Sequence, residues 1–190
     1  MLSCLAIRFV GCEKSQPLGA MTEFAQNGEY SSTQPTFQIL SLGDVNNSFE
    51  KISSKSKWIT VRRGGHIRLL HRGEENLRIL TTLSVFPNSI SEDAEATLTI
   101  DDQDFMGCVD VNFEPEGITF NEPAFLNILA SGVDLSCVDP NSLGIYYLND
   151  NTSEWEQMES DGFYVFPNLG KILVINARMY HFSRYAIGAE

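Results

Sequence analysis

Hydrophobic and polar residues alternate with a period of two over the C-terminal two-thirds of the chain. In 94–100, for example, Leu98 and Ile100 fall on one side while Thr97 and Thr99 fall on the other. Side chains of a strand point alternately to its two faces, so this period predicts half-buried strands. Segments with this pattern, or with a β-branched and aromatic composition, are 58–61, 66–70, 77–86, 94–100, 109–113, 124–129, 144–148, 154–158, 163–166, 171–176 and 185–187.

Turn-forming residues separate these segments. Pro87-Asn88, Asp139-Pro140, Asn149-Asp150-Asn151 and Asp161-Gly162 combine side chains that favour tight turns. No long segment has the period of an amphipathic helix. Short strands separated by regular turns are typical of an all-β sandwich or barrel. We therefore predict an all-β fold, an antiparallel β-sandwich that follows a mostly irregular N-terminal segment.

The composition changes near residue 57. Ser, Gln, Asn, Gly and Thr dominate residues 13–56, which predicts a flexible spacer, although the alternation in Phe37–Leu42 would add one strand. Residues 57–190 are expected to form the sandwich. Residues 1–12 are mostly apolar and end in Val10-Gly11-Cys12.

The first twelve residues resemble the end of a bacterial lipoprotein signal, in which a small residue precedes a cysteine that becomes lipidated. On this interpretation Cys12 carries the lipid and the protein is tethered outside the cytoplasm; a short buried strand or a disordered end are the alternatives. Of the other cysteines, Cys108 and Cys137 could pair as a disulfide in an oxidising compartment or remain two buried thiols. No cysteine pair has the C-x-x-C spacing of a zinc site, and no cofactor is predicted.

Charge is unevenly distributed along the chain. The net charge is −12, yet residues 57–73 hold five bases and no acid, whereas residues 79–170 hold 17 acids and no base. This balance argues against nucleic acid as a partner, because phosphate binding needs clustered Lys and Arg over a large surface. Arg62, Arg63, Arg68 and Arg72 form the one basic patch. It either neutralises acidic strands or docks an acidic partner.

Several segments, in order, resemble the ZU-five domain of ankyrins, netrin receptors and bacterial surface proteins. They are Gly64–Leu69, Val85–Ile90, Val109–Pro123, Leu143–Trp155 and His181–Ala186. The resemblance implies an antiparallel β-sandwich that serves as an interaction or spacer module. In the central segment, Ile118 and Phe120 are expected to point together into the core.

The tripeptide His181-Phe182-Ser183 has a chemical interpretation. In some members of this family the same tripeptide cuts itself between Phe and Ser by an N-to-O acyl shift. Here His181 would act as the base, and the Ser183 hydroxyl would attack the Phe182 carbonyl to give an ester that water resolves. Alternatively, Tyr180, Phe182 and Tyr185 pack in a final strand, with His181 and Ser183 on its solvent face.

Two further features could bind a ligand. Asp101, Asp102 and Asp104 supply oxygen ligands of the kind calcium takes, or form an acidic hairpin turn. Trp155 could stack on a sugar or belong to the core. Taken together, the sequence predicts a non-enzymatic extracytoplasmic interaction or spacer module of the cell envelope. The alternatives are a self-cleaving module and a carbohydrate- or calcium-binding sandwich.

Overall fold

The computed structural model describes residues 38–39, 52–73, 76–101, 108–114, 118–136, 138–149, 151–181 and 184–189, with the backbone alone for 38–39, 101 and 108–114. One sheet contains β1 (Gln38–Ile39), β2 (Ile52–Ile59), β5 (Ala94–Asp101), β6 (Cys108–Glu114), β8 (Leu143–Asn149), β9 (Glu154–Gln157) and β12 (Arg184–Ala189). The other contains β3 (Gly65–Arg72), β4 (Arg78–Val85), β7 (Thr119–Ser131), β10 (Gly162–Phe166) and β11 (Lys171–His181). A 3-10 turn at Pro167–Leu169 joins β10 to β11.

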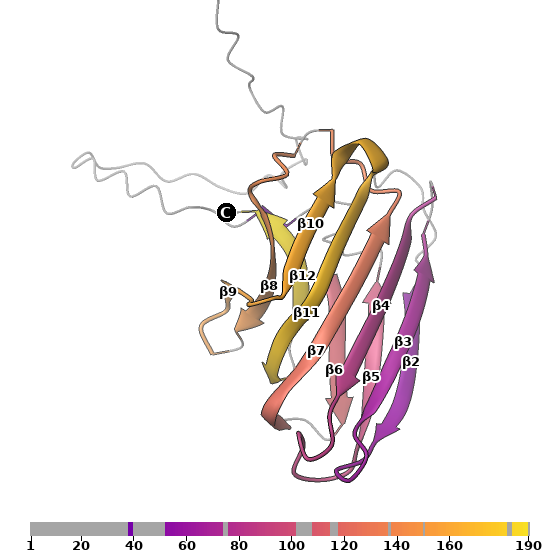
Figure 1. Cartoon of the computed structure of the whole chain (residues 1–190), viewed down its shortest axis with the longest axis vertical. Helices are drawn as coiled ribbons and strands as arrows, with labels where there is room; N and C mark the ends of the chain where they lie inside the picture. Colours follow the sequence, from indigo (N-terminus) through magenta and orange to yellow (C-terminus); the bar gives the residue numbers. More distant parts are fainter. Residues whose placement is uncertain are drawn as a thin grey trace, which may run out of the picture. The chain divides into compact units, whose positions relative to one another are not determined.

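Every strand pairing between these elements is antiparallel. The seven-stranded sheet has the order β2-β5-β6-β12-β8-β9, with β1 also paired to β12, and the five-stranded sheet has the order β10-β11-β7-β4-β3 (Figure 1). Each segment predicted from the sequence pattern overlaps one of these strands. The prediction of an all-β antiparallel fold is confirmed.

One hydrophobic core lies between the two sheets. It contains Leu98 and Tyr185 from the seven-stranded sheet and Leu83, Leu126 and Met179 from the five-stranded sheet. Each of these side chains is at most 2% exposed. The inward-pointing residues of the two sheets thus supply the apolar burial that stabilises the fold.

Ile118 and Phe120 are 6% and 7% exposed and belong to this core, as predicted for the central segment.

The edge strands β2 and β3 are linked by side chains, which joins the two sheets along one side. The Lys55 ammonium donates to the Arg68 carbonyl oxygen at 3.1 Å, and Ser53 Oγ lies 3.1 Å from His71 Nδ1. Strand β2 pairs with β5 from Ile52 onward, so it begins five residues before the predicted start of the domain. The first part of this strand could not be predicted from the sequence, because Ser53-Ser54-Lys55-Ser56 would present polar side chains on both faces of a strand.

A β-bulge interrupts β11. The register against β7 shifts between Val174 and Ala177, and Asn176 adopts a left-handed conformation with φ of 50°. The Asn176 backbone N–H donates to Asn127 Oδ1 at 3.0 Å, and Asn127 Nδ2 donates to Asn176 Oδ1 at 3.2 Å. The extra residue reverses which side chains point inward.

The reversal corrects one expectation. Without the bulge, Tyr180 would share the inward face with Val174. With it, Met179 is buried and Tyr180 is 53% exposed. The prediction that Tyr180 packs inward is wrong for this reason, whereas Tyr185, in the next strand, is buried as predicted.

Strands β11 and β12 lie in different sheets but follow each other closely. β11 ends at His181 in the five-stranded sheet, and β12 begins at Arg184 in the middle of the seven-stranded sheet, between β6 and β8. The chain therefore passes from the five-stranded to the seven-stranded sheet between His181 and Arg184. In the described part of the chain, no helix is long and apolar enough to cross a membrane.

Candidate functional site

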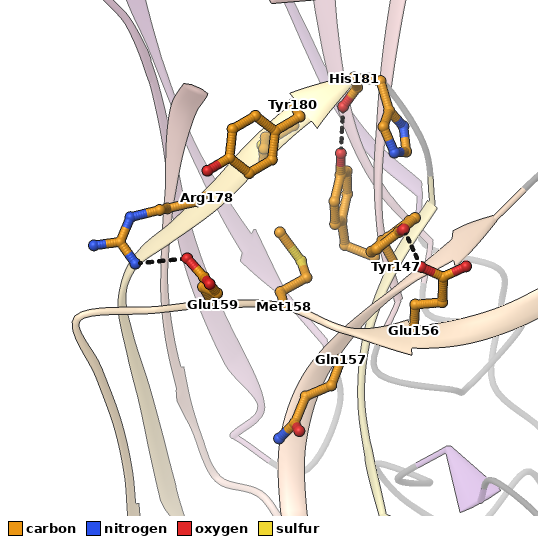
Figure 2. A pocket seen from close by; sticks show the side chains of 10 residues that line it. Tyr147, Glu156, Gln157, Met158, Glu159, Arg178, Tyr180 and His181 are labelled. Carbon is orange, nitrogen blue, oxygen red and sulfur yellow. Dashed lines mark hydrogen bonds and ion pairs between the residues drawn. The ribbon is translucent and has the colours of Figure 1, made fainter. Parts of the chain in front are cut away.

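A cavity of about 330 Å³ lies where the ends of β8, β9, β11 and β12 meet. Figure 2 shows its lining, which combines aromatic, charged and thioether side chains: Tyr147, Glu156, Gln157, Met158, Glu159, Arg178, Met179, Tyr180, His181 and Tyr185. It adjoins His181 and therefore the tripeptide that the sequence singles out.

The Glu156 carboxylate is held by two hydrogen bonds. The Tyr147 hydroxyl donates to Oε2, and Asn149 Nδ2 donates to Oε1 at 2.5 Å. These hydrogen bonds stabilise the charged form, so they hold the pKa of Glu156 below its ordinary value. The bond from Tyr147 has the largest effect, and the charge of His181 lowers the pKa further. The same bond raises the pKa of Tyr147, because ionisation would remove the hydrogen that the hydroxyl donates to Glu156.

His181 is half-buried at the end of β11. Its ring packs edge-on against the Tyr147 ring, with centroids 4.9 Å apart, and its carbonyl oxygen accepts a hydrogen bond from the Tyr185 hydroxyl at 2.6 Å (Figure 2). The predicted base thus lies beside an ionised carboxylate and has its backbone held by the following strand.

Arg178 forms the opposite rim of the cavity. Its guanidinium lies 3.4 Å from Glu159 Oε2 and 2.8 Å from Asp161 Oδ1. Asn176 Nδ2 also donates to Asp161, at 3.0 Å, so the bulge and this ion pair support each other. The charge of Arg178 is thereby compensated within the protein.

Most other predicted site residues lie outside the described part of the chain. These are Cys12, Asp102, Asp104, Cys137, Phe182 and Ser183. Asp101 ends β5 and Cys108 begins β6, opposite Ala186 of β12, but only their backbones are described. The lipid, disulfide and calcium sites therefore stay predictions. Among the residues whose side chains are described, no three His, Cys, Asp or Glu residues are grouped as metal ligands.

Trp155 is half-buried in β9, where it pairs with Leu148.

The basic patch predicted from the sequence is divided in the fold. Arg62 and Arg63 lie exposed in the turn after β2. Arg68 and Arg72 lie on β3 and point away from the core, since Ile67, Leu69 and His71 of the same strand point into it.

The face of the five-stranded sheet that points away from the core, the outer face, carries an apolar row. In register, Leu70 opposes Leu80, Leu80 opposes Leu129, Leu129 opposes Leu173, and Leu173 opposes Tyr164. This outer row crosses the sheet from β3 to β10. Leu70, Leu129 and Tyr164 are 46%, 40% and 49% exposed. The sequence alone did not identify it, because its members are up to 103 positions apart (173 minus 70) and only the register aligns them.

The outer face is also basic. The five strands of this sheet contain five bases, Arg68, Arg72, Arg78, Lys171 and Arg178, and one acid, Glu122. Arg178 is compensated by Glu159 and Asp161, so the remaining strand residues of this sheet have an excess of three bases (four minus one), within a chain whose net charge is −12.

Comparison with models of protein families, with curated proteins and with solved structures finds no match for this chain. The observations define it as a two-sheet antiparallel β-sandwich with an exposed apolar and basic sheet face.

Proposed function

We propose that this chain is a non-enzymatic protein-interaction module whose binding surface is the outer face. The outer row of Leu70, Leu80, Leu129, Leu173 and Tyr164 carries this proposal. Single exposed apolar residues are ordinary on protein surfaces, but a continuous apolar strip bounded by polar residues is typical of a binding site.

The energetics favour a bound partner. Burying one exposed leucine side chain contributes about 1.5–3 kcal/mol. Leu70, Leu129 and Tyr164 are 46%, 40% and 49% exposed, so covering each of them contributes roughly half of this amount. The three side chains project from paired strands of one sheet, so little ordering entropy opposes association on this side of the interface.

We further propose that this module lies at the cell envelope, tethered through Cys12; the resemblance to the ZU-five domain and the lipoprotein-like N-terminus support this proposal. The residues before β2 would then connect the lipid to the sandwich.

Site-specific photo-cross-linking in the cells that produce the protein tests the proposed function. Tyr164 on the outer face and Trp58 on the other sheet are both exposed aromatics, at 49% and 62%, and each can be replaced by benzoylphenylalanine. The proposal predicts a covalent protein adduct from position 164 but none from position 58. Equal yields, or no adduct from position 164, would contradict it.

A second candidate function is self-cleavage between Phe182 and Ser183. The position of His181 favours this function. Its ring packs against the Tyr147 ring, and His181 is the last residue of β11. An N-to-O acyl shift needs a base close to the serine hydroxyl, and His181 immediately precedes the Phe182-Ser183 pair in the sequence.

Cleavage would leave β12 in place. Residues Arg184–Ala189 pair with β6 on one side and β8 on the other. A native gel would not reveal the cut, so the test is a mass spectrum in denaturant. Two masses that meet between Phe182 and Ser183, and one mass for Ser183→Ala, are expected from self-cleavage; a single intact mass for the wild type ends this candidate.

A further inference from the structure

We infer that the outer face binds an acidic amphipathic helix of a partner protein, with its apolar stripe along the outer row. This inference rests on the proposed function and adds the chemistry and shape of the partner. Three features of the outer face carry it: a like-charge pair, the spacing of the flanking bases and the length of the row.

Arg72 and Arg78 stand directly opposite each other in the β3–β4 register. Like charges at directly opposed positions destabilise a sheet. Both side chains are exposed, and among the described residues neither forms an ion pair. A carboxylate from outside would convert this repulsion into attraction.

The same register row continues across the sheet. Arg78 opposes Ser131, which opposes Lys171, so three bases lie along one side of the outer row. Arg68 lies on its other side, two residues from Leu70. Two residues along a strand span about 6.6 Å, so the bases lie about this far from the outer row. On an α-helix, the positions that flank an apolar stripe lie at a similar distance from the centre of the stripe.

The outer row has the length of a short helix. It crosses five strands, and neighbouring strands are about 4.8 Å apart, so its ends lie about 19 Å apart. At 1.5 Å per residue, about 13 residues of α-helix cover this distance. Leucines at a and d positions would contact the row, and acids at the e and g positions would reach the bases on either side.

An anionic membrane would offer the same two kinds of contact. The chain as a whole carries −12, however, so a broad anionic surface repels most of the protein. A short helix contacts the basic face alone. Charge therefore favours the helix.

The test measures the binding of two labelled peptides by fluorescence anisotropy. Each is about 14 residues long, has leucine at a and d, and is held helical by a lactam bridge, because isolated helices of this length are marginal. One carries Glu at e and g, and the other carries Lys. The inference predicts that the Glu peptide binds at least about tenfold more tightly, with an affinity that falls as salt rises.

A charge reversal separates binding from folding. Arg78→Glu places a carboxylate opposite Arg72, so the melting temperature should stay level or rise while Glu-peptide affinity falls about tenfold. The matched control, Arg63→Glu, makes the same change in the exposed turn and should alter affinity by less than about twofold.

The inference would be overturned by equal affinity for the two peptides, by no effect of Arg78→Glu, or by binding of phosphatidylglycerol vesicles in place of the Glu peptide. A dimer in sedimentation that Leu129→Ser dissociates, with neither peptide bound, would assign the face to a second copy of the chain. A cross-linked adduct from position 164 without Glu-peptide binding would remove the acidic helix but retain the interaction function.

Discussion

Replacing Gly64 by alanine should destabilise the sandwich far more than replacing Gly65. Gly64 ends the turn after β2, where its N–H donates to the Thr60 carbonyl at 2.7 Å, and it has a φ of +63°. A Cβ at this position would lie 2.1 Å from the Val85 carbonyl oxygen and 2.7 Å from the Phe86 carbonyl carbon. Both neighbours are backbone atoms, so they can move only if β4 moves.

The cost follows from two contributions. A non-glycine residue in the left-handed region costs about 1–2 kcal/mol. Forcing the backbone of β4 aside adds about 1–3 kcal/mol, as other overpacked sites do. Gly64→Ala should therefore lower the free energy of unfolding by about 2–5 kcal/mol.

Gly65→Ala is the matched control. The nearest atom to its Cβ would be Ile59 Cδ1, at 2.5 Å, which is the flexible end of a side chain; the Cα and Cγ1 of Ile59 would lie at an ordinary contact distance of 3.7 Å. A rotamer change relieves this contact, so a loss of about 1 kcal/mol is expected.

Urea unfolding followed by circular dichroism measures both variants. A loss of about 3 kcal/mol corresponds to a fall in Tm of roughly 6–12 °C for a domain of this size. Gly64→Asn adds a second check: asparagine tolerates positive φ but keeps the Cβ, so it should cost nearly as much as alanine. Equal losses for Gly64→Ala and Gly65→Ala would refute the reasoning.

Three further predictions concern the site, the bulge and the two faces of β7. Tyr147→Phe removes the main hydrogen bond to Glu156, so a carbon-detected NMR titration should show the pKa of Glu156 rising toward its ordinary 4.5; an unchanged pKa would exclude that bond. Because the pKa of Glu156 is lower in the folded state, this bond stabilises the folded wild type above about pH 4.5, and the stabilisation is lost as the pH falls through the folded pKa. The Tyr147→Phe variant lacks the bond, so its stability should fall less over the same acidic range. Asn127→Ala breaks both hydrogen bonds to Asn176 and should cost about 2 kcal/mol in urea unfolding, whereas Thr82→Ala, opposite Asn127 in β4, should cost under about 0.5 kcal/mol. Leu126→Ala should cost about 3 kcal/mol and Leu129→Ala under about 1 kcal/mol, because Leu126 is fully buried and Leu129 is 40% exposed; similar losses would place β7 in the wrong register.

The strands could be predicted from the sequence because the two faces of each strand differ in polarity. The alternation of Leu98 and Ile100 with Thr97 and Thr99 fixes both the strand and its buried side. The polar Ser53–Ser56 segment of β2 has no such contrast, so only the end of this strand, within the predicted segment 58–61, could be predicted. Its hydrogen bonds come from β5, which no local pattern reveals.

The register and the bulge could not be predicted in the same way. The outer row depends on pairings such as Leu80 with Leu129, and residues so far apart give no periodic signal. The bulge at Asn176 reverses the inward face of β11 and exposes Tyr180. The candidate site could be predicted only in part for the same reason. The tripeptide pointed to His181, but its neighbours Tyr147 and Glu156 belong to β8 and β9, and only the fold brings these strands next to β11.

Both proposals require that the outer row faces solvent in the register described. Paramagnetic broadening of leucine methyl NMR signals by a soluble gadolinium chelate tests this most directly. Strong broadening is expected for Leu70 and Leu129, and little for Leu83 and Leu126, which are fully buried. Broadening of Leu83 and Leu126, with Leu70 and Leu129 protected, would contradict it.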